Sequence, residues 1–188
     1  MPRCSDFEVT VLDAGGDRAE TTVHALRGDG AIVLDLWSTT CTRCPAALEK
    51  LHDFAKAQPA DVGVIFASLN CDDADLAEEL TDESEWTSMT HLFMETSQKD
   101  IAKAELGLKA FPFVIAVDKN GDVAYAGPAK GADYAALAPK LLQGNAAAVT
   151  DENAAPNAAP AAAGGDAVAT KQAEGTAALD DFALDEDF

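Results

Sequence analysis

Residues 32–44 read IVLDLWSTTCTRC, and this stretch decides the fold of the chain. Its first part, residues 32–37, is apolar except for Asp35, which is typical of a central strand covered on both faces. Cys41 and Cys44 follow, and a run with helical spacing of apolar residues comes next. We therefore expect both thiols at the first turn of a helix, where the macrodipole and the free N–H groups favour a thiolate. Two intervening residues let the sulfurs form a small disulfide ring, so the pair is predicted to be a redox device.

The same C-x-x-C spacing also occurs in zinc sites. A structural zinc ion needs four ligands, and no second C-x-x-C or paired Cys/His follows. Cys4 and Cys71 would complete such a site only if the fold brought them together. His24, His52 and His91 are scattered and show no ligand spacing. We therefore predict no metal site and no cofactor.

Strand and helix patterns alternate on both sides of this stretch. Strands are expected at residues 7–12, 32–37, 62–69, 113–117 and 123–126, with residues 21–24 as a returning strand. Helices are expected at residues 44–57, 75–85, 97–106 and 132–142. Asn120-Gly121 is a strong hairpin signal between the last two strands. The order predicts an α/β fold with a central mixed β-sheet flanked by helices on both faces.

The formal net charge of -20 limits the classes of partner. Phosphate binding needs clustered Lys and Arg, so no nucleic acid is expected, and docking on anionic membrane surfaces is equally disfavoured. No apolar stretch approaches the roughly 20 residues of a membrane helix. Residues 1–6 have no apolar region of the signal-peptide kind, so we expect a cytoplasmic, reducing compartment. Cysteines in that compartment are more often catalytic or buried than paired in structural disulfides.

The composition changes near Gly144. Residues 145–188 are rich in Ala, Pro, Gly and Asp, and with few large apolar side chains they cannot offset the entropy of ordering. We therefore predict a folded domain at residues 1–144 and a disordered acidic tail at residues 145–188. Residues 179–188 hold two Asp-rich pieces that each end in Phe, which predicts a docking motif for a protein partner. An inert solubilising tail is the alternative.

Several separated motifs make the chain similar to the thioredoxin superfamily. Trp37 and the cysteine pair match the W-x-x-x-C-x-x-C pattern of that family, and Asp35 falls where thioredoxins carry a buried acid. Phe111-Pro112 matches the family's proline, which is cis and faces the disulfide. The resemblance covers about residues 6–143 and is closer to the TlpA-type and peroxiredoxin-like branch than to minimal thioredoxin. It implies a thioredoxin-like fold and a redox-active disulfide.

Asp35 and Pro112 are also unusual without reference to the family. An ionised carboxylate in a buried strand would cost several kcal/mol, so we expect Asp35 to have a raised pKa that suits a proton acceptor for Cys44. A solvated Asp at an edge is the alternative. Pro112 is out of place inside a central strand, and a cis bond after Phe111 would explain it and leave backbone free to pair with a substrate. An ordinary trans proline at the strand entrance is the alternative.

The residues around the cysteine pair define a predicted site. The catalytic residues are Cys41, Cys44 and Asp35, and the substrate-binding residues are Trp37, Thr40, Arg43, Phe111 and Pro112. Arg43 should lower the thiol pKa and make the pair more oxidising. Compared with the family, Thr40 replaces a tryptophan, and Ser68 stands near the position of a lysine that tunes the site of thioredoxin. Trp37 is either a platform beside the site or a core residue.

The leading hypothesis is a thiol-disulfide oxidoreductase that reduces protein disulfides. Cys41 would attack the partner disulfide, Cys44 would resolve the mixed disulfide, and an upstream thiol or flavoprotein reductase would supply electrons. A thiol peroxidase is the second class, since Ser38 stands three residues before Cys41, although Leu34 occupies the place of the proline in the peroxiredoxin motif. The third class is a thioredoxin-like adaptor, which would bind to a larger assembly through its acidic tail.

Overall fold

The structure is a computed structural model and describes residues 3–12 and 18–143. Residues 144–188, with the predicted disordered tail and the docking motif at residues 179–188, lie outside the described residues. The strands of the described chain are β1 (Glu8–Leu12), β2 (Arg18–Thr22), β3 (Ala31–Trp37), β4 (Val64–Asn70), β5 (Thr90–Phe93), β6 (Phe113–Val117) and β7 (Val123–Pro128). Its helices are α1 (Val23–Arg27), α2 (Cys44–Lys56), α3 (Ala74–Glu83), α4 (Thr96–Leu106), α5 (Tyr134–Gln143) and the short 3-10 helix η1 (Ala129–Gly131).

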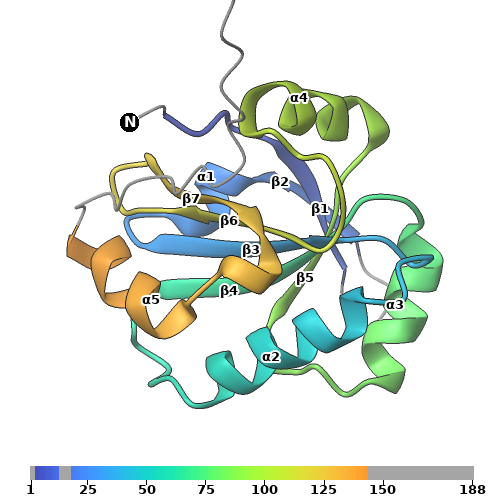
Figure 1. Cartoon of the computed structure of the whole chain (residues 1–188), viewed down its shortest axis with the longest axis horizontal. Coiled ribbons are helices and arrows are strands. Elements are labelled where there is room, and N and C mark those ends of the chain that lie inside the picture. Colours follow the sequence, from blue (N-terminus) through green and yellow to red (C-terminus); the bar gives the residue numbers. More distant parts are fainter. Residues whose placement is uncertain (1–2, 13–17, 144–188) are drawn as a thin grey trace, which may run out of the picture. The chain divides into compact units, whose positions relative to one another are not determined.

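The strands form one mixed sheet in the order β2-β1-β5-β4-β3-β6-β7 (Figure 1). β3, β4 and β5 run parallel, and β6 and β7 follow as an antiparallel pair on the other side of β3. β1 joins β5 antiparallel, which adds the N-terminal hairpin β1–β2 to the far edge. This sheet confirms the predicted α/β fold with a mixed sheet.

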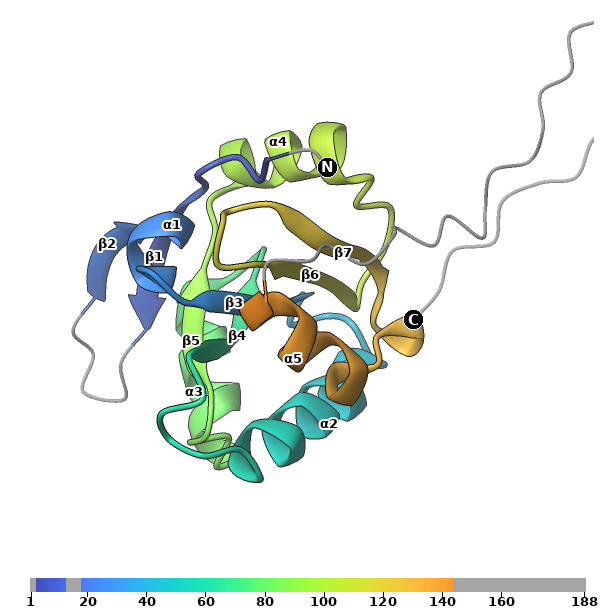
Figure 2. The ribbon, with the colours of Figure 1, turned by 90° about the vertical axis from the view of Figure 1, so that its left-hand side faces the viewer.

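β3 lies in the middle of the core, and all seven of its residues are buried. Its side chains alternate between two apolar clusters, because successive residues of a strand face opposite sides of a sheet. Val33 and Trp37 pack with residues of α2 and α5, whereas Ile32 and Leu34 pack in the cluster that holds α1 and α4 residues. Helices therefore cover both faces, and Figure 2 shows α4 and α2 on opposite sides of the sheet.

β5, α1 and the short helix η1 were not predicted. β5 has only four residues and includes a histidine, so its sequence carries a weak strand signal. The predicted strand at residues 21–24 was wrong in its second half, because β2 ends at Thr22 and α1 begins at Val23. The Thr22 hydroxyl accepts a hydrogen bond from the Ala25 N–H at 3.2 Å, which caps this short helix.

The hairpin between β6 and β7 forms where Asn120-Gly121 predicted it. Gly121 has φ 85°, a left-handed conformation that favours glycine. The Asp118 carboxylate accepts hydrogen bonds from the Asn120 and Asp122 N–H groups at 2.8 and 3.0 Å. Cys4 N–H donates to the Gly121 carbonyl at 3.0 Å, so the hairpin also holds the start of the described chain.

Candidate active site

Cys41 and Cys44 are joined by a disulfide, with their Cα atoms 5.4 Å apart. Only Cys44 lies in the helix, because α2 begins there and Cys41 occupies the preceding turn. The expectation that both thiols lie in the first helical turn was therefore wrong for Cys41. Its N–H donates to the Ser38 carbonyl at 3.1 Å, and its carbonyl accepts from the Cys44 N–H at 3.1 Å. Cys41 is partly exposed, whereas Cys44 is fully buried, so the outer sulfur is the one that a partner can reach.

The Phe111–Pro112 peptide bond is cis, as predicted. It lies just before β6, the strand that pairs with β3. Arg43 Nη2 donates to the Phe111 carbonyl at 3.4 Å, which places the proline loop beside the start of α2. The Pro112 carbonyl accepts from the Ala129 N–H at 3.2 Å, so the first residue of η1 also contacts this loop.

Asp35 lies in the middle of β3 and is fully buried, which excludes a solvated edge position. Its neighbours in register are Ser68 on β4 and Val114 on β6. Neither carboxyl oxygen forms a hydrogen bond of normal geometry with a described residue. Burial raises the pKa of Asp35 to about 8, and the Tyr134 hydroxyl and the Lys50 ammonium offset only part of that rise. The predicted increase in pKa is therefore confirmed.

The loop between β3 and the cysteines is held by Asp72, which follows β4. Its carboxylate accepts hydrogen bonds from the Thr39 N–H at 3.0 Å, the Ser38 hydroxyl at 2.8 Å and the Asn70 side-chain amide at 2.9 Å. Burial alone would raise the pKa of Asp72, but these hydrogen bonds lower it below its ordinary value. Thr40 is exposed next to Cys41, where the sequence predicted a surface for substrates.

No protein-family model matches the sequence, and no curated protein matches it. Solved structures do match in shape. A hypothetical protein from Sinorhizobium meliloti 1021 is 22% identical, with a TM-score of 0.58 over 79% of this chain and 86% of that chain. An uncharacterized thioredoxin-like protein from Porphyromonas gingivalis is 18% identical, with a TM-score of 0.55 over 76% of this chain and 90% of that chain. The thioredoxin domain of a thiol-disulfide oxidoreductase from Bacteroides vulgatus is 17% identical, with a TM-score of 0.51 over 65% of this chain and 86% of that chain.

The chain has a thioredoxin-like fold. In this fold the cysteine pair lies at the carboxyl end of β3, and the cis proline precedes the neighbouring strand β6. These are the relative positions that the resemblance implied for Cys41, Cys44 and Pro112.

Tyr134 and Lys50 belong to this thioredoxin-like site but were not predicted from the sequence. Tyr134 is the first residue of α5, is 3% exposed, and has a hydroxyl without a hydrogen bond of normal geometry to a described residue. Lys50 on α2 lies over the Tyr134 ring, with Nζ 5.2 Å from the ring centroid, and donates to the Ala132 carbonyl at 3.0 Å. Burial and the neighbouring Asp35 raise the pKa of Tyr134. A tyrosine within the last predicted helix was the only sequence signal for Tyr134. Lys50 was predicted on the exposed side of its helix, so its sequence position gave no indication of a role in the site.

Trp37 is 2% exposed and packs in the apolar cluster beneath the thioredoxin-like site. Its role in substrate contact therefore stays a prediction. Ser68, which stands near the position of thioredoxin's lysine, donates its hydroxyl to His91 Nδ1 at 2.8 Å. His91 Nε2–H donates to the Trp86 carbonyl at 2.9 Å, and burial lowers the pKa of His91, so both bonds suit the neutral ring. Ser68 thus has a structural partner of its own.

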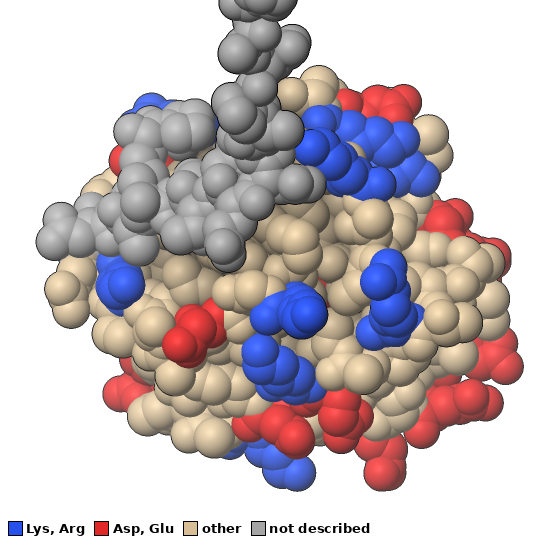
Figure 3. Space-filling model, in the orientation of Figure 1, with Lys and Arg blue, Asp and Glu red and all other residues tan. Residues whose placement is uncertain are grey.

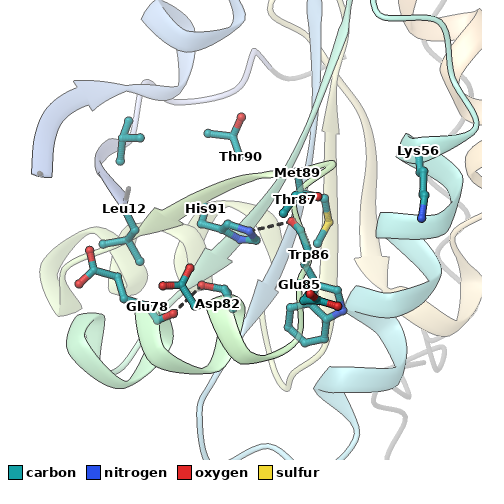
Figure 4. A pocket seen from close by; sticks show the side chains of 12 residues that line it. Leu12, Lys56, Glu78, Asp82, Glu85, Trp86, Thr87, Met89, Thr90 and His91 are labelled. Atoms are coloured by element: carbon teal, nitrogen blue, oxygen red, sulfur yellow. Dashed lines mark hydrogen bonds between the residues drawn. The ribbon is translucent and has the colours of Figure 1, made fainter. Parts of the chain in front are cut away.

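A hollow of about 760 Å³ lies beside α3 (Figure 4). His91, Trp86 and Met89 line it together with Glu78 and Asp82 of α3, and neither cysteine of the disulfide takes part. Within residues 3–12 and 18–143, no three His, Cys, Asp or Glu side chains are grouped so that they could hold a metal ion. No helix of the described chain has the length and apolar character needed to cross a membrane.

Proposed function

We propose that the chain is a thiol-disulfide oxidoreductase that reduces disulfides of partner proteins with its Cys41–Cys44 pair. One observation carries the proposal: β3 contains a fully buried acid of raised pKa and leads into a partly exposed disulfide, and Arg43 between the two cysteines contacts the loop of a cis proline. A metal site or a structural disulfide would need none of these features together. Solved structures of the same fold include the thioredoxin domain of a thiol-disulfide oxidoreductase, which supports the proposal.

The first step uses the exposure of Cys41. In the reduced protein, the Cys41 thiolate attacks one sulfur of the partner's disulfide, forms a mixed disulfide, and releases the partner's other sulfur as a thiolate. Cys44 is buried beneath Cys41 and has no access to the partner's disulfide, so it takes no part in this attack.

The second step resolves the mixed disulfide. Asp35 takes the proton of the Cys44 thiol, and the Cys44 thiolate attacks the Cys41 sulfur. The Cys41–Cys44 bond forms, and the second partner sulfur leaves as a thiolate that takes a proton from solvent. Two electrons have then passed from the dithiol to the partner, and the protein is in the disulfide form that the structure shows. Because the pKa of Asp35 is about 8, its basic form becomes more abundant as pH rises through that value.

Return to the dithiol requires two electrons from outside the chain. An upstream thiol reductant or flavoprotein reductase would supply them by the same exchange, with no cofactor bound to this chain. The proposal places this cycle in a reducing compartment, the cytoplasm, where a donor of this class is present.

The test is reduction of insulin disulfides with a small dithiol as donor. We expect the wild type to accelerate the reaction, and both Cys41→Ser and Cys44→Ser to abolish the acceleration. The matched control is Cys71→Ser, since Cys71 is a free, buried cysteine that should not contribute. Equal rates of insulin reduction for the wild type and both site variants would refute the proposed enzymatic function.

Consumption of hydrogen peroxide distinguishes this proposal from a thiol peroxidase. The Ser38 hydroxyl that would face a peroxide is within 2.8 Å of the Asp72 carboxylate and 2.9 Å of the Thr40 hydroxyl, so it is already engaged. We expect no consumption of hydrogen peroxide above background. Consumption that Cys41→Ser removes and Cys44→Ser retains would favour the peroxidase instead.

Docking through residues 179–188 remains part of the proposal for partners. The Cys44→Ser variant should trap partners as mixed disulfides, and these can be compared for the full chain and a chain that lacks residues 179–188. A loss of specific partners on truncation is the expected result. Identical sets of trapped partners would remove the case for a docking motif.

A further inference from the structure

Three exposed cations belong to the cis-proline loop or to segments that contact it, and we call Arg43, Lys109 and Lys130 the basic rim. Arg43 contacts the loop directly, with Nη2 3.4 Å from the Phe111 carbonyl oxygen. Lys109 precedes Phe111 by two residues in the same loop. Lys130 follows the residue whose N–H donates to the Pro112 carbonyl at 3.2 Å. The basic rim therefore takes one cation from the residue before α2, one from the proline loop and one from η1, and the first and last of these segments contact the proline loop.

The rim cations are not neutralised within the described chain. Its ion pairs join Arg18 to Asp75 and Glu78, and Lys103 to Asp100, and none of them includes the rim. The side chains of Lys109 and Lys130 form no hydrogen bond with residues 3–12 or 18–143. The one side-chain hydrogen bond of Arg43, to the Phe111 carbonyl, is long at 3.4 Å. The three side chains are therefore available to a partner.

Two carboxylates, that of Asp72 beside the loop before Cys41 and that of Asp133 after η1, already have other partners. Asp72 accepts hydrogen bonds from Ser38 and Thr39, and Asp133 accepts one from the Ala136 N–H at 3.1 Å as it caps α5. Figure 3, in the orientation of Figure 1, shows Lys and Arg side chains in the middle of the face that carries η1 and α2, and also over α4, whereas many Asp and Glu side chains lie toward its lower and right-hand margins. The rim thus carries three positive charges in a chain of formal net charge -20.

We propose that the basic rim selects partner proteins whose reactive disulfide is flanked by acidic residues. An extended Asp- or Glu-rich segment would lie along the Phe111-Pro112 loop, and its carboxylates would meet Arg43, Lys109 and Lys130 while its disulfide reaches Cys41. This inference rests on the proposed oxidoreductase function and adds a substrate class to it. Because three exposed charges act through solvent, they should speed encounter more than they tighten a final complex.

The net charge of the chain favours an acidic peptide segment over a nucleic acid or an anionic membrane as the binding partner of the rim. A nucleic acid or an anionic membrane would meet the negative charge of the remaining surface over a wide area, whereas a short acidic segment need contact only the rim. A flanking carboxylate on each side of the partner's cysteine places the opposite charges within reach of the rim, where Coulomb attraction in water is useful but modest.

The test uses disulfide-linked peptides with the same reactive cysteine and with flanks of Asp, Asn or Lys. We expect kcat/KM to be about tenfold higher for Asp than for Asn flanks at low salt, and the ratio to fall toward about twofold at 0.5 M salt because the charges are exposed. The triple variant R43Q/K109Q/K130Q should lose most of this ratio. The matched control is K56Q/K119Q/K140Q, which removes three exposed cations elsewhere and should keep the ratio.

The ratio between peptides, and not the absolute rate, is the readout, because Arg43 also lies next to the reactive thiols. The double variant K109Q/K130Q, which leaves Arg43 in place, should lose part of the ratio. Equal turnover of Asp- and Asn-flanked peptides by the wild type would overturn the inference, as would an equal loss of the ratio in the control triple variant. Failure to turn over any of the peptides would refute the oxidoreductase function itself.

Discussion

Replacing Asp35 with Leu tests the buried acid, because leucine has a similar size and no charge. The pKa of Asp35 is raised from its ordinary 3.8 to about 8 in the folded protein. Between these values the unfolded chain has lost the proton and the folded chain has kept it, so the stability of the wild type falls as pH rises. At about 1.4 kcal/mol per pH unit, the acid costs about 4 kcal/mol at pH 7 and about 6 kcal/mol above pH 8.

The measurement is urea unfolding of the oxidised protein at intervals between pH 4 and pH 9. The free energy of unfolding of Asp35→Leu minus that of the wild type should grow by about 5 kcal/mol from pH 4 to pH 8 and level off at higher pH. The value at pH 4 reports the change in packing alone, so only the growth is diagnostic. Asp35→Asn should show the same growth. A difference that does not depend on pH would refute the raised pKa.

Three further outcomes follow from the structure. Tyr134→Phe removes a hydroxyl that lowers the pKa of Asp35, so the alkaline rise in the rate of mixed-disulfide resolution should shift to higher pH in stopped-flow measurements. Cys4 and Cys71 are 2% and 1% exposed, and burial raises the pKa of each thiol to about 12, so iodoacetamide at pH 8 should leave both unmodified in the native oxidised protein, as mass spectrometry would show. Gly30→Ala places a Cβ 2.5 Å from a backbone carbonyl oxygen, so the free energy of unfolding in urea should fall by about 2 kcal/mol.

Each of these outcomes has its own check. Tyr125→Phe is the control for the tyrosine, since the Tyr125 hydroxyl donates to the Pro128 carbonyl at 2.8 Å and should not affect the pH profile. An unshifted profile in Tyr134→Phe would contradict the contact with the acid. The urea-unfolded chain should be alkylated at Cys4 and Cys71, and rapid alkylation of the native protein would show that these thiols open to solvent. An unchanged unfolding midpoint in Gly30→Ala would contradict the close approach at the start of β3.

The centre of the fold was predictable because its signals are local. β3 and α2 have strong patterns of apolar residues. Asp35 and Pro112 stand out because buried strands rarely contain a charged residue or a proline. The boundaries of β3 differ from the prediction by one residue, and those of β6 not at all. These strands are buried on both faces, and such strands have nearly continuous apolar sequences that can be recognised directly.

The remainder depends on contacts between distant residues. β5 becomes a strand because β1 and β4 pair with it on both sides, and its own four residues do not demand that structure. Tyr134 and Asp35 are almost one hundred residues apart, and only the packing of α5 on the sheet brings them together. The place of Cys41 depends on where the first helical hydrogen bonds form, a detail that apolar periodicity does not resolve.

The buried acid belongs to a strand in the interior of the sheet. β3 is paired on both sides, to β4 and β6, so any displacement of Asp35 would break hydrogen bonds in the middle of the sheet. The groups that modulate this acid lie instead on α2 and α5, which pack on the sheet without being part of it. Under the proposed function, exchanging side chains on these two helices would retune the chemistry while the sheet stays constant, so chemical variation and folding stability are assigned to different parts of the molecule.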